Sequence, residues 1–216
     1  IAYGAKTGDH IALVMGNYPE FVALKFAIAN IGCIAIPMNF LLHKDEMKYV
    51  IQQSDCTMLI TMERFRDLDY LQMLDDIEPG WETQTSSAVF PKLRTIITFN
   101  PDGTTRNTTT CLADIEAASA QVGKSVVDAR EVTVEPNAVA DIVYTSGTTG
   151  VSKGAMLTHA NVLISSYSSA LIRGLGDGHK TLFALPLYHV FAYVEGLLAV
   201  MWVGGAVIMQ LAFDPK

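Results

Sequence analysis

The sequence is poor in positive charge. Its 15 lysines and arginines are outnumbered by 22 aspartates and glutamates, and the formal net charge is −7. Because proteins hold nucleic-acid phosphates with lysine and arginine, we expect no nucleic-acid partner. Half of the 216 residues are hydrophobic and only 17% are charged. A chain of this size and composition can bury a large core without a metal ion or disulfide to hold it.

Cysteine is also scarce. Cys33, Cys56 and Cys111 are odd in number, far apart and without the spacing of metal ligands. Each lies in or beside an apolar run, which favours small core residues in a reducing compartment. The first residues show no signal peptide, and no internal repeat or low-complexity segment follows. We therefore expect a cytoplasmic protein.

Only one hydrophobic run is long enough to suggest a membrane span. Residues 190–207 are mostly apolar, but Glu195 lies inside the run and Gly204 and Gly205 break it into the lengths of a helix and a strand. A charged side chain at the centre of a bilayer costs a few kcal/mol. The pattern therefore predicts a buried helix and no membrane span, and it leaves open only a peripheral contact with a membrane.

The two ends of the chain predict a piece of a longer protein. The first residue is Ile1 rather than methionine, and the residues after it run directly towards an apolar strand pattern. The last residues, Pro215 and Lys216, follow another strand pattern at once.

Strand patterns alternate with helix patterns along the chain. Short apolar runs predict strands, and apolar residues at helical spacing or helix start signals predict helices between them. Residues 78–91 show no periodicity and predict a loop. The alternation predicts an α/β fold with mainly parallel sheets and flanking helices. The predicted strands are 11–15, 34–37, 57–61, 93–99, 139–144, 181–185 and 206–210, and the predicted helices are 17–32, 43–53, 63–77, 111–122, 161–172 and 190–203.

The stretch with the strongest chemical signal is residues 144–154, with the sequence YTSGTTGVSKG. Glycine permits left-handed turns that direct several backbone N–H groups at one anion, and hydroxyls and Lys153 add further donors. An apolar strand pattern precedes the stretch, and Thr158 is a suitable N-cap for a helix after it. The stretch predicts a phosphate-binding loop; the alternative is a flexible surface linker. It is not a Walker A motif, because Ser152 stands where the second glycine would fall.

Residues 145–154 resemble the signature of the adenylate-forming superfamily, which includes acyl-CoA synthetases such as long-chain fatty acid–CoA ligases, aryl-CoA ligases, firefly luciferase and peptide-synthetase adenylation domains. Residues 6–13, 17–21 and 32–39 resemble further blocks of acyl-CoA synthetases, and the resemblance is weakest over residues 78–132. Ser152 stands where the family usually has proline, which predicts a somewhat more mobile loop. The resemblance implies that residues 1–216 are part of a large N-terminal AMP-binding domain, without its remainder or the C-terminal domain.

The resemblance also implies roles for the loop. Lys153 is expected to be catalytic and to bind ATP phosphates together with Thr145, Ser146, Gly147, Thr148, Thr149 and Gly150. ATP, Mg²⁺ and, as a substrate, CoA are the implied small molecules. The family reaction joins a carboxylate to AMP with release of pyrophosphate, after which the CoA thiol displaces AMP. No residue of this chain is assigned as a metal ligand.

A second motif contains His189. Residues 185–191, LPLYHVF, resemble the Pro-Leu-x-His-x-Phe block of acyl- and aryl-CoA ligases. That resemblance implies that His189 lines the acyl pocket near the reacting carboxylate, as a neutral donor. The alternative is a core histidine. For His159, at the predicted helix start, a structural role is favoured.

These features predict an AMP-forming ligase that activates a small-molecule acid, fatty or otherwise apolar, with ATP and transfers it to CoA. The ligase would be a longer protein, and this chain alone would be inactive. An aryl-CoA ligase of the 4-coumarate type and a non-catalytic nucleotide-binding relative remain alternatives. Amino-acid adenylation is disfavoured, because such domains usually carry aspartate where Asn39 stands. The sequence does not define an oligomeric state.

Overall fold

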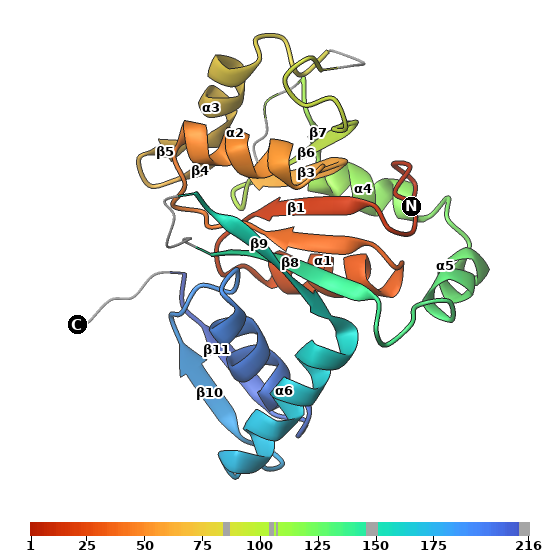
Figure 1. Cartoon of the computed structure of the whole chain (residues 1–216), viewed down its shortest axis with the longest axis vertical. Coiled ribbons are helices and arrows are strands. Elements are labelled where there is room, and N and C mark those ends of the chain that lie inside the picture. The colour runs from red at the N-terminus through yellow and green to blue at the C-terminus, as the bar shows by residue number, and fades with distance from the viewer. Residues whose placement is uncertain (84–86, 104–105, 107, 146–150, 212–216) are drawn as a thin grey trace.

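A computed structural model describes residues 1–83, 87–103, 106, 108–145 and 151–211. The large sheet and its helices form the upper part of the molecule in Figure 1, and α6, β10 and β11 form the lower part. The elements are β1 (His10–Val14), α1 (Pro19–Asn30), β2 (Ile34–Pro37), α2 (Lys44–Gln53), β3 (Met58–Met62), β4 (Arg64–Phe65), β5 (Leu68–Asp69), α3 (Tyr70–Ile77), β6 (Thr95–Phe99), β7 (Thr110–Cys111), α4 (Leu112–Ser119), α5 (Lys124–Glu131), β8 (Val139–Thr145), β9 (Lys153–Thr158), α6 (His159–Ile172), β10 (Lys180–Phe183), the π-helix η1 (Phe191–Leu198), α7 (Ala199–Met201) and β11 (Ala206–Met209).

The large sheet has seven strands in the order β7-β6-β3-β1-β2-β8-β9. Neighbouring strands are parallel except for β9, which runs antiparallel to β8 at the edge. Strands β1 and β3 are apolar along almost their whole length and buried, as expected of parallel strands covered on both faces. The α/β fold with mainly parallel sheets is therefore confirmed.

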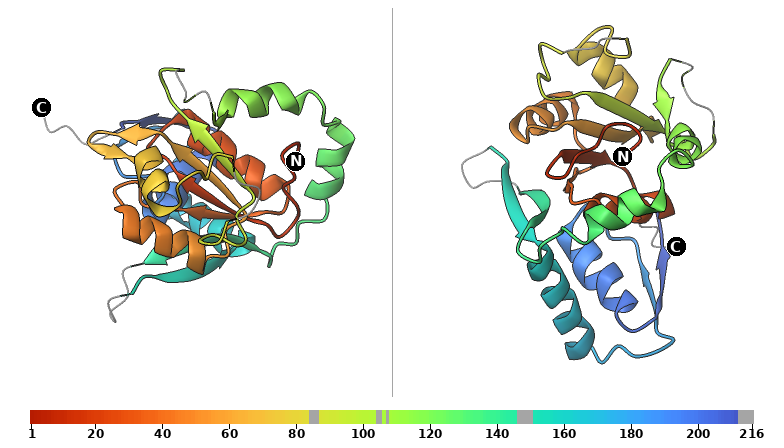
Figure 2. Two further views of the ribbon diagram at one scale, coloured as in Figure 1. Left: turned by 90° about the horizontal axis from the view of Figure 1, so that it is seen from above. Right: turned by 90° about the vertical axis from the view of Figure 1, so that its right-hand side faces the viewer.

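The lower part of the molecule contains a second, parallel pair of strands, β10 and β11. The η1–α7 helix lies between this pair and α6 (Figure 2, right). The predicted helix over residues 190–203 is confirmed in place, but residues 191–198 form a π-helix, with i→i+5 hydrogen bonds, rather than an α-helix. In the described part of the chain, no helix has both the length and the apolarity that crossing a membrane requires.

The predicted helix over residues 63–77 is wrong in its first half. Strands β4 and β5 pair there as a short antiparallel hairpin, and Arg66 takes the positive φ of 53° that the turn requires. The helix begins only at Tyr70, because the Asp69 carboxylate accepts a hydrogen bond from the backbone N–H of Gln72 and caps it. The spacing of Phe65 and Leu68 that suggests a helix brings them opposite each other across the hairpin instead.

Two elements of the weakly patterned middle region were not predicted. Helix α5 lies over residues for which no helix was predicted. The predicted helix over 111–122 begins one residue later, because Thr110 and Cys111 pair with β6 as β7, and it ends at Ser119. All three cysteines are free, as expected, and Cys33 and Cys56 are buried. Burial raises the pKa of the Cys33 thiol to about 11 and that of Cys56 to about 12, so both remain protonated core residues.

Candidate functional site

The glycine-rich loop joins two strands rather than a strand and a helix. Residues 153–158 form β9, which pairs with β8 before α6 begins and was not predicted as a strand. Gly154 permits this hairpin: a Cβ on it would lie only 2.6 Å from the Cγ2 atom of Ile142 on β8. The helix start itself is confirmed, because the Thr158 hydroxyl accepts a hydrogen bond from the N–H of Asn161.

The hairpin brings the two ends of the loop together. Thr145 is the last residue of β8 and Lys153 the first of β9, and they are paired across the two strands. Directly opposed residues have Cβ atoms about 5 Å apart, so the Thr145 hydroxyl and the Lys153 side chain share the loop entrance. Both are exposed to solvent. The other predicted phosphate-binding residues, Ser146, Gly147, Thr148, Thr149 and Gly150, lie outside the described residues.

Helix α2 supports the loop from one side. The Tyr49 hydroxyl donates to the carbonyl oxygen of Ser152 at 2.9 Å, and the Tyr144 hydroxyl donates to the side-chain carbonyl of Gln53. Burial raises the pKa of Tyr144 to about 12, so its hydroxyl keeps the proton that it donates. The sequence predicted extra mobility at Ser152, but its carbonyl is held by Tyr49, a contact between residues 103 positions apart.

His189 lies at a cavity of about 360 Å³ between β9, α6 and η1. Its side chain is exposed at this cavity and does not lie in the core. Its Nδ1 atom accepts a hydrogen bond of 3.2 Å from the N–H of Phe191, so a neutral ring carries its proton on Nε2 and can donate it to a ligand. We call this space the His189 cavity. Its other lining residues are Leu157, Asn161, Val162, Ser165, Val190, Phe191, Val194 and Glu195.

Asn17 fixes the segment that carries His189. Its side-chain N–H groups donate to the carbonyl oxygens of Leu185 and Gln210, each at 2.9 Å, and its side-chain oxygen accepts from the N–H of Leu187 at 2.8 Å. Asn17 is only 6% exposed and follows β1 closely. This role was not predicted from the sequence, although a polar residue just past a buried strand is a signal that could have revealed it.

A buried ion pair lies beneath the hairpin. Lys25 of α1 contacts Asp141 of β8, and their side chains are 3% and 4% exposed. The Lys25 ammonium also lies 4.4 Å from the ring centroid of Tyr193. Burial lowers the pKa of Lys25, and the attraction of Asp141 opposes that shift. Lys25 and Asp141 line a small cavity together with His159. Burial lowers the pKa of the His159 imidazole.

The pair was not predicted from the sequence, although two signals existed. Lys25 lies between Phe21 and Ile28 on the buried face of α1, and Asp141 interrupts an apolar strand.

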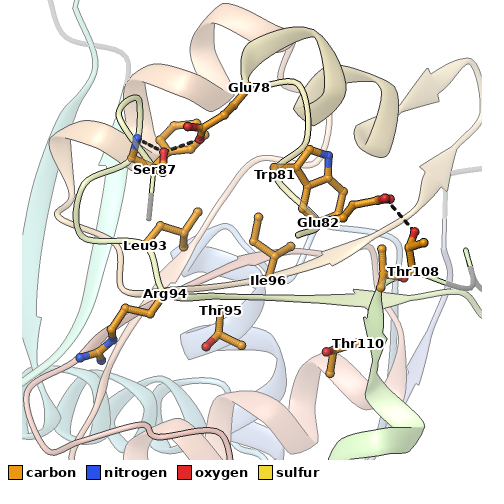
Figure 3. Close-up of a pocket in the computed structure, with 12 residues that line it drawn as sticks. Glu78, Trp81, Glu82, Ser87, Leu93, Arg94, Thr95, Ile96, Thr108 and Thr110 are labelled. Atoms are coloured by element: carbon orange, nitrogen blue, oxygen red, sulfur yellow. Dashed lines mark hydrogen bonds between the residues drawn. The ribbon is translucent and has the colours of Figure 1, made fainter. Parts of the chain in front are cut away.

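A polar cavity of about 180 Å³ lies at the other end of the strand order, beside β6 and β7. On its wall, the Ser87 hydroxyl donates a hydrogen bond to Glu78, and the Thr108 hydroxyl donates one to Glu82 (Figure 3). Glu82 also pairs with Arg106. None of the residues predicted to bind ATP or the acid lines this cavity, so it is separate from the candidate site. In the described ranges, no group of three or more histidine, cysteine, aspartate or glutamate side chains is arranged to hold a metal ion.

The fold and the site together define an α/β domain in which the candidate ligand-binding loop follows the carboxyl end of β8, where sheets of this kind bind their ligands. The chain belongs to the family of AMP-binding enzymes, which it matches over residues 1–216.

Known relatives agree with this assignment. The putative acyl-CoA synthetase YngI of Bacillus subtilis is 32% identical over 217 residues, covering 98% of this chain and 39% of YngI. The ATP-bound structure of MatB from Rhodopseudomonas palustris has a TM-score of 0.76 at 24% identity, covering 99% of this chain and 37% of MatB. The N-terminal domain of FACL13 from Mycobacterium tuberculosis has a TM-score of 0.72 at 22% identity, covering 99% of this chain and 46% of that one. The chain thus spans about two fifths of the length of YngI.

Proposed function

We propose that this chain is the N-terminal part of an AMP-forming carboxylic acid–CoA ligase that activates a fatty or other apolar acid. One observation carries the proposal: strand β9 begins with Lys153 at the loop entrance and reaches the His189 cavity at Leu157. Four residues of extended strand cover about 13 Å, so the loop and the cavity are close enough for one substrate pair. The family membership and the name of YngI support the same reaction class.

The chemical task is to bring two anions together. A carboxylate must attack the α-phosphate of ATP, and the pyrophosphate must leave with its negative charge. Lys153 and the Thr145 hydroxyl, at the loop entrance, are placed to stabilise that charge, and fixed donors do so most effectively in a site that excludes water. The Nε2–H of His189 would hold the acid's carboxylate at the cavity. The CoA thiol would then attack the acyl carbonyl and displace AMP.

The lining of the His189 cavity favours an apolar acid. Leu157, Val162, Val190, Phe191 and Val194 form most of its wall. A flat aromatic acid, the substrate of an aryl-CoA ligase, would also bury its ring against such a surface. The exposed Lys153 and the accessible His189 argue against a relative that only binds nucleotide.

The proposal is tested by acid-dependent pyrophosphate release from the full-length protein. With ATP and a panel of straight-chain, branched and aromatic acids, we expect release with apolar acids, and AMP production that rises when CoA is added. The ranking within the panel separates an acyl-CoA ligase from an aryl-CoA ligase. If no acid supports release from a folded, ATP-binding protein, the non-catalytic alternative is correct.

Replacing His189 with Ala should lower kcat/KM for the preferred acid and raise the relative preference for bulkier acids. Losing the hydrogen bond to the carboxylate should cost about 1–3 kcal/mol, while the space left by the ring admits branched or aromatic groups. The measurement is the same acid panel, with thermal melts to exclude misfolding. His189→Gln retains a donor and should recover part of the loss.

His179→Ala is the matched control, because it removes an exposed imidazole from the turn before β10. An unchanged acid profile and unchanged kcat/KM in His189→Ala would show that the ring does not contact the acid.

A further inference from the structure

Lys25 of α1 contacts elements from both halves of the candidate site. Its ammonium pairs with Asp141 on β8, and it lies 4.4 Å from the ring centroid of Tyr193 on η1. Strand β8 ends with Thr145 at the loop entrance, and the N–H of Tyr193 donates to the carbonyl oxygen of His189 at 3.1 Å. One side chain therefore contacts both the strand that leads into the loop and the helix that follows His189.

The Lys25 ammonium is enclosed by the protein. Lys25 and Asp141 are buried, and Asp141 is the one hydrogen-bond partner of the ammonium within the described ranges. Attraction between opposite charges, and between a cation and the face of a ring, is stronger where water is excluded. A buried ammonium that lost either partner would be poorly compensated, which is unfavourable. Strand β8 and helix η1 therefore cannot move apart without breaking a buried contact.

Helix α1 also packs behind the wall of the His189 cavity. Phe26, together with Leu157, packs against a small cluster of buried residues from α6 and η1, which consists of Val162, Val194 and Leu198. Leu157, Val162 and Val194 line the His189 cavity as well. Apolar attraction is non-directional, whereas the ion pair and the cation–π contact require particular positions of β8 and η1 at the same time.

We propose that Lys25 is a positioning residue that fixes the phosphate-binding loop relative to the wall carrying His189, and so aligns ATP with the acid. This inference rests on the proposed ligase function and adds to it a buried residue outside the His189 cavity. Adenylation needs a carboxylate oxygen close to the α-phosphate, and a displacement of about 1 Å between two reactants can slow a reaction roughly a hundredfold. Lys25 acts through Asp141 on the loop side and through Tyr193 on the acid side.

A residue in this role has a kinetic signature of its own. Each subsite stays intact when the alignment is lost, so ATP and the acid should each keep a KM close to that of the wild type. Only the step that joins them should slow. Thioester formation from a supplied acyl adenylate should not change, because the acid and AMP are then already joined. Partial misfolding would instead slow both half-reactions together.

The experiment uses two variants of the full-length protein that break the link in different ways. Tyr193→Leu removes the ring and keeps the ion pair. Lys25→Met combined with Asp141→Leu removes both charges from the interior, which proteins often tolerate without loss of stability. In each variant, pyrophosphate release at saturating ATP and acid should slow roughly ten- to hundredfold. Thioester formation from synthetic acyl adenylate should stay at the wild-type rate.

Two further variants serve as controls. Tyr193→Phe keeps the ring that the ammonium faces and should recover most of the rate that Tyr193→Leu loses. Tyr3→Leu removes a ring that also packs against the main hydrophobic core, but from the segment before β1, and should adenylate at the wild-type rate. Thermal melts of every variant record any change in stability.

The outcomes separate this inference from the proposed ligase function. Wild-type adenylation by Tyr193→Leu or by the double variant overturns the positioning role and leaves the ligase function standing. A raised KM for the acid with an unchanged kcat also overturns it, because Tyr193 would then serve the acid pocket alone. Equal slowing of both half-reactions overturns it as well. If the wild type releases pyrophosphate with none of the acids, the ligase function is wrong, and this inference with it.

Discussion

Replacing Lys153 with Ala in the full-length protein should slow formation of the acyl adenylate by about 30- to 1,000-fold. The side chain stands at the loop entrance opposite Thr145 and is exposed to an incoming phosphate. Removing one charge-assisted donor from a site that closes around its substrates costs roughly 2–4 kcal/mol of transition-state stabilisation. Thioester formation from supplied acyl adenylate should change much less, because pyrophosphate has then already left.

The two half-reactions are measured separately, by pyrophosphate release and by thioester formation from synthetic acyl adenylate. Lys180→Ala is the matched control, since Lys180 is also the exposed first residue of a strand, β10. It should leave both rates at the wild-type level. Equal losses in both half-reactions of Lys153→Ala, with a lower melting temperature, would indicate general misfolding and would remove Lys153 from the phosphate site.

Replacing Lys25 with Met should lower the free energy of unfolding by about 3–5 kcal/mol, because it leaves the Asp141 carboxylate buried without a counter-ion. The loss should be visible as a shift of the urea midpoint. Since α1 and β8 meet at this pair, the same variant should also weaken nucleotide binding at the loop that β8 leads into.

A double variant distinguishes the charge from the packing. Lys25→Met with Asp141→Leu removes both charges and should recover most of the lost stability, since apolar residues of similar size often replace a buried pair without loss. As a control, Lys124→Met breaks the exposed pair of Lys124 and Asp128 on α5 and should leave the urea midpoint almost unchanged. If the double variant is no more stable than Lys25→Met, the cost lies in lost packing and the ion-pair explanation is wrong.

The parts of the fold that were predictable carry a local signal. Strands β1, β2 and β3 are short apolar runs because both faces of a parallel sheet are covered, and such runs can be recognised without knowing their partners. Strand β9 carries no such signal. Its first four residues are exposed and begin with Lys153 and Gly154, so nothing in its own sequence distinguishes it from the loop before it.

The candidate site also consists of residues with a local sequence signal and residues without one. The loop and His189 could be proposed from the sequence because each lies in a compact motif with a strong chemical signature. The groups that support them were not, because their partners are remote in the sequence: Lys25 and Asp141 are 116 residues apart, and Tyr49 and Ser152 are 103 apart.

The hydrogen bonds of Asn17 have a consequence for the order of folding. Its three partners, Leu185, Leu187 and Gln210, lie 168, 170 and 193 residues further along the chain. Contacts of such long range form late, and during synthesis β1, β2 and β3 can pair before any of those partners exists. The Asn17 side chain must then stay solvated beyond the carboxyl end of the central strand β1 until residues 185–210 arrive. The wall that carries His189 is thus expected to be among the last parts of the domain to mature, and a ribosome-bound intermediate should contain a formed sheet with an incomplete acid-binding side.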